Sequence, residues 1–205
     1  MDPIASKIFL YVVIVLSASF HEFAHALVAY RLGDPTAKNL GRLTLNPLVH
    51  LDPVGTVVIP LFLLLTSGTF IGWAKPVPYN PLLLRDQRYG SLKVGLAGPA
   101  SNLLIALILG LLIRLGAGTA TGEHYSIFFN LMADIILINI FLALFNLIPI
   151  PPLDGSKIVM DLFPRVMPAI GGFGIWGIFL ALLIAPYLLS PIAFLLFRLI
   201  TGIPV

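Results

Sequence analysis

Long apolar runs organise this chain. Four of them are long enough to cross a membrane: 8–31, 92–116, 127–148 and a run within 168–200. About 20 mostly apolar residues in a helix span the hydrocarbon core of a bilayer. The pattern therefore predicts four to five transmembrane helices. The last run contains two prolines, so it predicts either one long kinked helix or a span followed by a piece at the membrane interface.

The segment 54–72 is also apolar, but it is short and is interrupted by glycine and proline. Basic loops flank it on both sides: the first carries Arg31, Lys38 and Arg42, and the second carries Lys75, Arg85, Arg88 and Lys93. Basic loops stay on the cytoplasmic side of a membrane, so this segment has to enter and leave from the same side. We expect a re-entrant segment, covered at membrane depth by protein or by a watery cavity.

Two loops have a strand-like pattern. Residues 39–46 (NLGRLTLN) alternate between apolar and polar positions, and 73–79 (WAKPVPY) place Trp73, Val77 and Tyr79 on one face if extended. Two prolines confine the second stretch to an edge. These loops predict either turns at the membrane surface or a small sheet beside a functional site. The predicted fold class is an all-α polytopic membrane protein with a re-entrant segment and short strand-like surface loops.

Composition agrees with a membrane protein. Of 205 residues, 59% are hydrophobic and 10% are charged, whereas soluble domains have about 25% charged residues. The mean hydropathy is +1.02. The N-terminal run lacks a convincing signal-peptide cleavage site, so we expect it to remain as the first span. We expect a multi-pass protein of the cell membrane that forms one membrane-embedded domain, 1–205.

Charge and cysteine content exclude several kinds of partner and site. The net charge of +3 comes from residues beside the spans, which the positive-inside rule explains without a nucleic-acid partner. The chain has no cysteine, so it has neither disulfides nor thiolate metal ligands. Any metal site must use histidine and carboxylate side chains.

The most informative motif is HEFAH, residues 21–25, inside the first apolar run. A helix places positions i and i+4 on one face, about 6 Å apart along the axis. His21 and His25 can therefore bind one zinc ion, and Glu22 can take a proton from a water molecule activated there. Ionisable residues within a membrane span are costly and usually functional.

A catalytic zinc ion usually has three protein ligands, so the motif lacks one. Glu123 and His124 lie in a loop without Lys or Arg, which is expected on the outer side. Asp134 lies nearer the outer end of its span. Two candidates remain on the cytoplasmic side: His50 and Asp154.

Asp154 follows a proline-rich stretch, IPIPP, that ends the preceding helix at about residue 148. Its carboxylate either turns back into the bundle or caps the helix that begins at Asp-Gly-Ser. If 54–72 is re-entrant, the spans 8–31 and 127–148 run in the same direction. Asp154 then lies at the same cytoplasmic end as His21 and His25, in agreement with the loop charges.

HEFAH in one span and NLIPIPPLDG after a later one resemble the intramembrane zinc metalloproteases of the site-2 protease family, peptidase family M50. The stretches GRLTLNPLVHLDPVGT, GWAKPVPYNP and AGPASN resemble its compact prokaryotic branch, which lacks a PDZ domain. The resemblance covers residues 21–155. It implies that His21, His25 and Asp154 bind zinc and that Glu22 is the general base. It also implies that Asn146 lies near the active site and that the transmembrane segment of a membrane-protein substrate is cleaved.

The predicted function is therefore intramembrane zinc proteolysis, with the catalytic core at about 8–160, a helical tail at 165–205 and the active site toward the cytoplasm. A neutral amide such as Asn146 could stabilise the oxyanion of the tetrahedral intermediate. The alternative is a non-proteolytic membrane zinc-binding or transport protein. Glu22 between the two histidines favours the protease, because transporters usually distribute ionisable ligands over several spans.

Overall fold

The computed structural model describes residues 2–66, 72–116, 123–166, 168, 171–172 and 174–203. This part of the chain is mostly helical and contains no β-strand. The chain divides into two compact units, Met1–Gly90 and Ser91–Val205.

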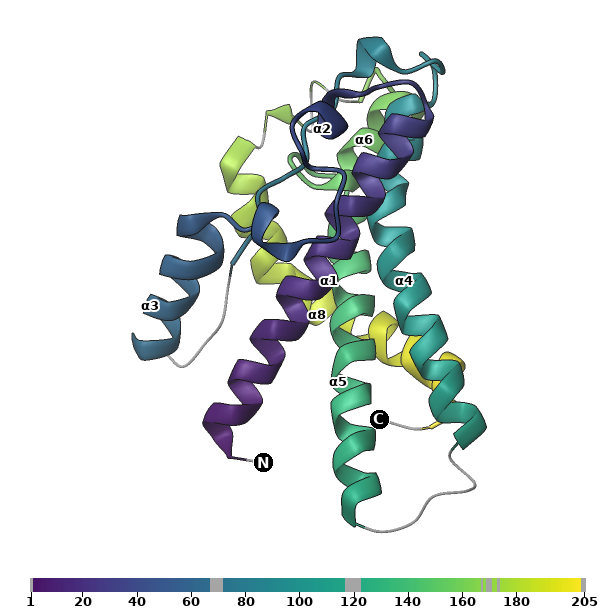
Figure 1. Cartoon of the computed structure of the whole chain (residues 1–205). Helices are drawn as coiled ribbons and strands as arrows, with labels where there is room; N and C mark the ends of the chain where they lie inside the picture. Colours follow the sequence, from purple (N-terminus) through teal and green to yellow (C-terminus); the bar gives the residue numbers. More distant parts are fainter. Residues whose placement is uncertain are drawn as a thin grey trace. The chain divides into compact units, whose positions relative to one another are not determined.

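The first unit is built around α1, Pro3–Arg31 (Figure 1). Asp2 caps this helix by accepting a hydrogen bond from the Ile4 N–H, and proline occupies its first turn, where a missing N–H costs nothing. The helix ends at Arg31, and Gly33, two residues later, has a φ of +107°, which L side chains rarely adopt. The short α2, Thr36–Asn39, follows.

The prediction that 54–72 enters and leaves from one side agrees with its described part. The segment begins as a π-helix, Pro53–Val58, and continues as α3, Ile59–Thr66; residues 67–71 lie outside the described part. The Trp73 N–H donates to the Gly55 carbonyl at 3.1 Å, and the Thr56 hydroxyl donates to the Trp73 carbonyl at 2.8 Å. The chain therefore returns to the point where the segment began.

Neither strand-like loop forms a sheet in the described residues. Residues 39–46 form the end of α2 and a series of turns and bends, and 72–80 have no regular secondary structure. The N–H groups of Trp73 and Lys75 donate to the carbonyls of Gly55 and His50, while proline at 76 and 78 has no N–H to offer. Of the two interpretations, the described loops match surface turns. Two 3₁₀ turns complete the unit: Pro47–Val49 and Pro81–Leu83.

The second unit contains α4 (Gly90–Gly116), α5 (Glu123–Asn146), α6 (Asp154–Leu162) and α8 (Gly174–Thr201). Its core is formed by buried apolar side chains of the three long helices: Ala106, Ile113, Ile136, Ile140, Ala193 and Phe197. Inside it, the Asn102 amide donates to the Asn139 side-chain oxygen at 2.9 Å, and neither residue is exposed. The helices α4 and α5 are thus joined by a buried polar contact as well as by apolar packing.

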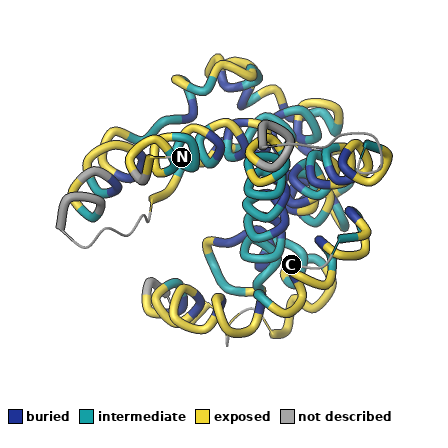
Figure 2. The backbone as a smooth tube through the Cα atoms, turned by 90° about the horizontal axis from the view of Figure 1, so that it is seen from below, coloured by how far each residue is buried: buried dark blue, intermediate teal, exposed yellow. Residues whose placement is uncertain are grey.

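Four helices are long and apolar enough to cross a membrane: Ile4–Arg31, Gly90–Gly116, Ile127–Asn146 and Trp176–Thr201. They match the four predicted spans and make this a multi-pass membrane protein. Many exposed positions along these helices (yellow in Figure 2) are large apolar residues, as expected for surfaces that face lipid. The last span is one helix, which continues through Pro186 and Pro191.

Candidate active site

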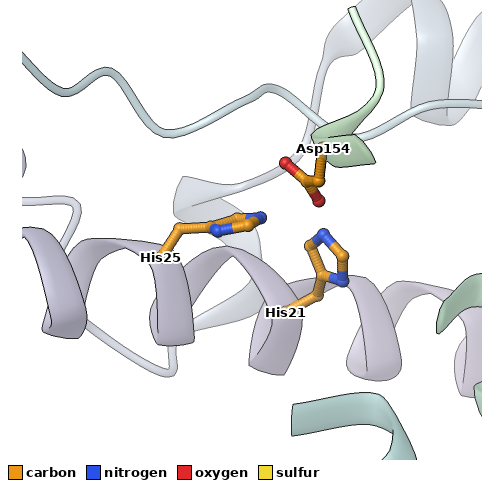
Figure 3. Close-up of side chains that lie close together, drawn as sticks. All are labelled: His21, His25 and Asp154. Carbon is orange, nitrogen blue, oxygen red and sulfur yellow. The ribbon is translucent and has the colours of Figure 1, made fainter. Parts of the chain in front are cut away.

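The histidine pair lies in the interior of α1. His21 and His25 are 6% and 5% exposed. Their ring centroids are 4.6 Å apart, with the rings at 82° to each other. Both imidazoles project from the same side of the helix (Figure 3), as the i, i+4 spacing requires. Two buried imidazoles this close can donate lone pairs to one metal ion.

Glu22 is held by the segment 72–80, which has no regular secondary structure. One carboxylate oxygen, Oε2, accepts a hydrogen bond of 2.7 Å from the Val77 backbone N–H. The Val77 side chain is itself buried against Ala26 and Ala37. The Glu22 carboxylate, next to His21 in the sequence, therefore has a fixed backbone partner on one of its two oxygens.

Asp154 lies in the second unit, where it is the first residue of α6 and only 5% exposed. The helix α5 ends at Asn146, as the prolines after it predict. At the next position, a Cβ on Gly155 would lie 2.3 Å from the Leu147 carbonyl oxygen and 2.5 Å from that of Ile148. Only glycine permits this turn to fold so closely on itself, and this turn sets where the Asp154 carboxylate lies.

Asp154 has a cationic neighbour on its own helix. The Lys157 ammonium contacts the Oδ1 atom of Asp154 at 2.7 Å. Position i+3 lies on the same helix face as position i, so the contact follows from the local sequence. The helix-cap interpretation of Asp154 is not what the structure shows, since the N-cap position is Leu153 and no side chain caps α6.

Comparison with known proteins supports a zinc-dependent protease. The model of peptidase family M50 matches residues 118–185, a stretch that contains Asp154 but not the histidine pair. YwhC of Bacillus subtilis, named as a predicted zinc metalloprotease, is 40% identical over 172 residues, covering 79% of this chain and 72% of YwhC. This chain belongs to peptidase family M50. It is therefore a zinc metalloprotease.

Other relatives are less similar to this chain. Rip2 of Mycolicibacterium smegmatis, also named as a predicted zinc metalloprotease, is 33% identical over 178 residues, covering 85% of this chain and 66% of Rip2. A Methanocaldococcus jannaschii protein with the same description is 30% identical over 141 residues, covering 68% of this chain and 63% of that protein. No solved structure matches the chain.

The remaining candidate residues, Asn146, His50, Glu123 and His124, differ in what the structure describes of their contacts. The Asn146 amide donates to the Leu142 carbonyl at 2.9 Å, within its own helix. His50 is buried, and its Nε2 is 2.9 Å from the Thr44 carbonyl oxygen. It belongs to no group of metal-binding side chains found in the described part of the chain. The side chains of Glu123 and His124 lie outside the described residues.

Two contacts of this M50 protein were not predicted from the sequence. A backbone donor such as the Val77 N–H carries no sequence signal, because any residue except proline supplies one. Lys157 could have been found, since its i, i+3 spacing from Asp154 on a short helix is readable in the sequence.

Proposed function

We propose that this M50 protein is an intramembrane zinc endopeptidase that hydrolyses peptide bonds in or near the transmembrane segments of membrane-protein substrates. His21, His25 and Asp154 are its zinc ligands, and Glu22 is its general base. One observation carries the assignment: the imidazoles of His21 and His25 are buried on one side of α1 with ring centroids 4.6 Å apart (Figure 3), and Glu22 stands between them in the sequence. Asp154, a buried carboxylate, completes the proposed ligand set.

The donor set fits a catalytic zinc site. Two neutral imidazoles and one carboxylate leave a fourth position for water, as catalytic zinc sites require. Two carboxylates, those of Asp154 and Glu22, balance the charge of a divalent cation, which favours a buried site within a membrane. Zinc supplies Lewis-acid chemistry to such a site, activating water and polarising a carbonyl group.

The residues of this chain then have distinct roles. Glu22 takes the proton from the attacking water and passes it to the leaving amine. Its bond to the Val77 N–H keeps one carboxylate oxygen in place, and the other oxygen is the proposed proton acceptor. The Asn146 amide carries two N–H donors; while one bonds the Leu142 carbonyl, the second can donate to the oxyanion of the tetrahedral intermediate.

The membrane setting supports the substrate class. His21 and His25 lie within a helix apolar enough to cross a bilayer. A substrate reaching this depth is itself membrane-embedded, and its helix must unwind locally because a helix engages its own carbonyls. The basic loops 31–53 and 73–93 support a site that opens toward the cytoplasm. We assign residues 1–205 to one membrane-embedded domain that carries out regulated intramembrane proteolysis.

The test compares Glu22→Gln with wild type in cells that co-express a library of single-span membrane proteins. Loss of the base should reduce cleavage by about 10²- to 10⁴-fold, while zinc measured in the purified protein is retained. Glu123→Gln is the matched control, because it makes the same chemical change at the only other glutamate of the chain. Undiminished cleavage by Glu22→Gln would refute the proposal. If wild type and Glu22→Gln both took up zinc into vesicles and neither cleaved a substrate, the protein would instead be a transporter.

A further inference from the structure

Lys157 is a charged residue at the candidate zinc site to which the proposed mechanism gives no role. Its ammonium contacts Oδ1 of Asp154 at 2.7 Å. The Asp154 side chain is 6% exposed and that of Lys157 is 25% exposed, so the ion pair is largely shielded from water. A contact that engages one of the two oxygens of a metal ligand constrains how that ligand can bind.

The stem of Lys157 is also confined. Helix α4 passes it at Gly95, where an added Cβ would lie 3.0 Å from the Lys157 Cβ and 3.4 Å from its Cδ. The same added atom would lie 3.1 Å from the Asp154 carbonyl oxygen. A side chain packed along its length in this way has fewer rotamers than a surface lysine, so its ammonium stays close to Asp154.

We propose that Lys157 is a positioning residue that makes Asp154 bind zinc through one oxygen. A carboxylate can offer one oxygen or two to a metal ion. With Oδ1 engaged by Lys157, Asp154 offers Oδ2, and the fourth position of a tetrahedral zinc site stays open for water. The inference rests on the proposed function, because it assumes that Asp154 is the third ligand.

The consequence of losing Lys157 follows from this geometry. Without the ammonium, both oxygens of Asp154 can turn to the metal ion, which raises its coordination number and occupies the space of the reacting water. Loss of a partner that orients a metal ligand typically costs about 10- to 100-fold in metal affinity or activity. A salt bridge that only stabilised α6 would affect folding and leave the coordination number unchanged.

The experiment uses the full-length protein in detergent, loaded with Co²⁺ in place of zinc, because the visible absorption of cobalt reports coordination number. Four-coordinate cobalt absorbs more strongly than five- or six-coordinate cobalt. Lys157→Met and Lys157→Ala remove the donor, whereas Lys157→Gln keeps an N–H that can bond Oδ1. Lys7→Met is the matched control, since Lys7 is an exposed residue of α1.

We expect wild type, Lys157→Gln and Lys7→Met to share the strong four-coordinate spectrum. Lys157→Met and Lys157→Ala should show weaker absorption per bound cobalt and at least about tenfold lower cleavage. Four-coordinate spectra in both donor-free variants would overturn the inference and leave the proposed function intact. The proposed metal centre requires that wild type bind cobalt with a visible spectrum and that His21→Ala abolish this spectrum. If wild type gave no such spectrum, or if His21→Ala kept it, the proposed metal centre itself would be wrong.

Discussion

Replacing Gly155 with alanine tests how closely the turn before α6 sets the position of Asp154. An alanine Cβ would lie 2.3 Å from the Leu147 carbonyl oxygen and 2.5 Å from that of Ile148. Both contacts are with backbone atoms, which cannot rotate away as the end of a side chain can. Because real Cβ contacts essentially never fall below 3.0 Å, the turn must open by at least about 0.7 Å.

Two measurable effects follow from this displacement. Forcing an extra methyl group into a packed site typically costs about 1–3 kcal/mol, so the melting temperature in detergent should fall. Asp154 adjoins the displaced residue and should move with it. A shift of about 1 Å in a group that positions the reaction can cost about 10²-fold in rate, so Gly155→Ala should lose activity beyond what its stability explains.

The assay measures melting temperature, zinc content and cleavage for Gly155→Ala beside Gly116→Ala. Gly116 is the last residue of α4, and a Cβ added there meets nothing within 4 Å, so the control makes the same chemical change without the clash. We expect the control to behave as wild type. If Gly155→Ala also kept the wild-type melting temperature and cleavage rate, the claim that this turn fixes Asp154 would be wrong.

Other contacts give further tests. Val77→Pro removes the N–H that holds Glu22, so kcat should fall about 10- to 100-fold with zinc retained. Val77→Ala keeps that N–H, and its kcat should be near the wild-type value. Equal activity of the two variants would contradict the role of this bond. Asn102→Leu leaves Asn139 without this amide donor and should destabilise the protein by about 0.6–2 kcal/mol, measured by thermal unfolding in detergent. The double variant with Asn139→Leu should lose less than the sum of the single changes, whereas strict additivity would mean that the two amides do not interact. A zinc chelator should abolish cleavage, and added Zn²⁺ should restore it; full activity in the chelator would exclude a metal-dependent reaction.

The two candidate functional contacts that sequence analysis did not find differ in kind. Val77 meets Glu22 across a separation of 55 positions in the chain, through a backbone group that every residue but proline has. Its use depends on the path taken by the segment 72–80, which no local pattern specifies. Lys157 meets Asp154 within one helical turn, so its contact depends only on α6 forming.

The strand-like loops show how a local pattern can mislead. Alternation in 39–46 and 73–79 left both a small sheet and surface turns open, but a strand needs a partner with free backbone groups. The N–H groups of Trp73, Lys75 and Val77 are already engaged by Gly55, His50 and Glu22. Those partners lie in other parts of the first unit, so tertiary contacts determined the outcome.

The sequence alone determined the four spans, the return of 54–72 and the pairing of His21 with His25. These features follow from apolar run length, from loop charge and from helical periodicity, all of which act over short stretches of chain. Only the tertiary structure decided which backbone group holds Glu22, how little room surrounds Gly155, and how α4 confines Lys157. Such features depend on where distant backbone segments pass one another, and packing at close range, rather than residue type, sets that path.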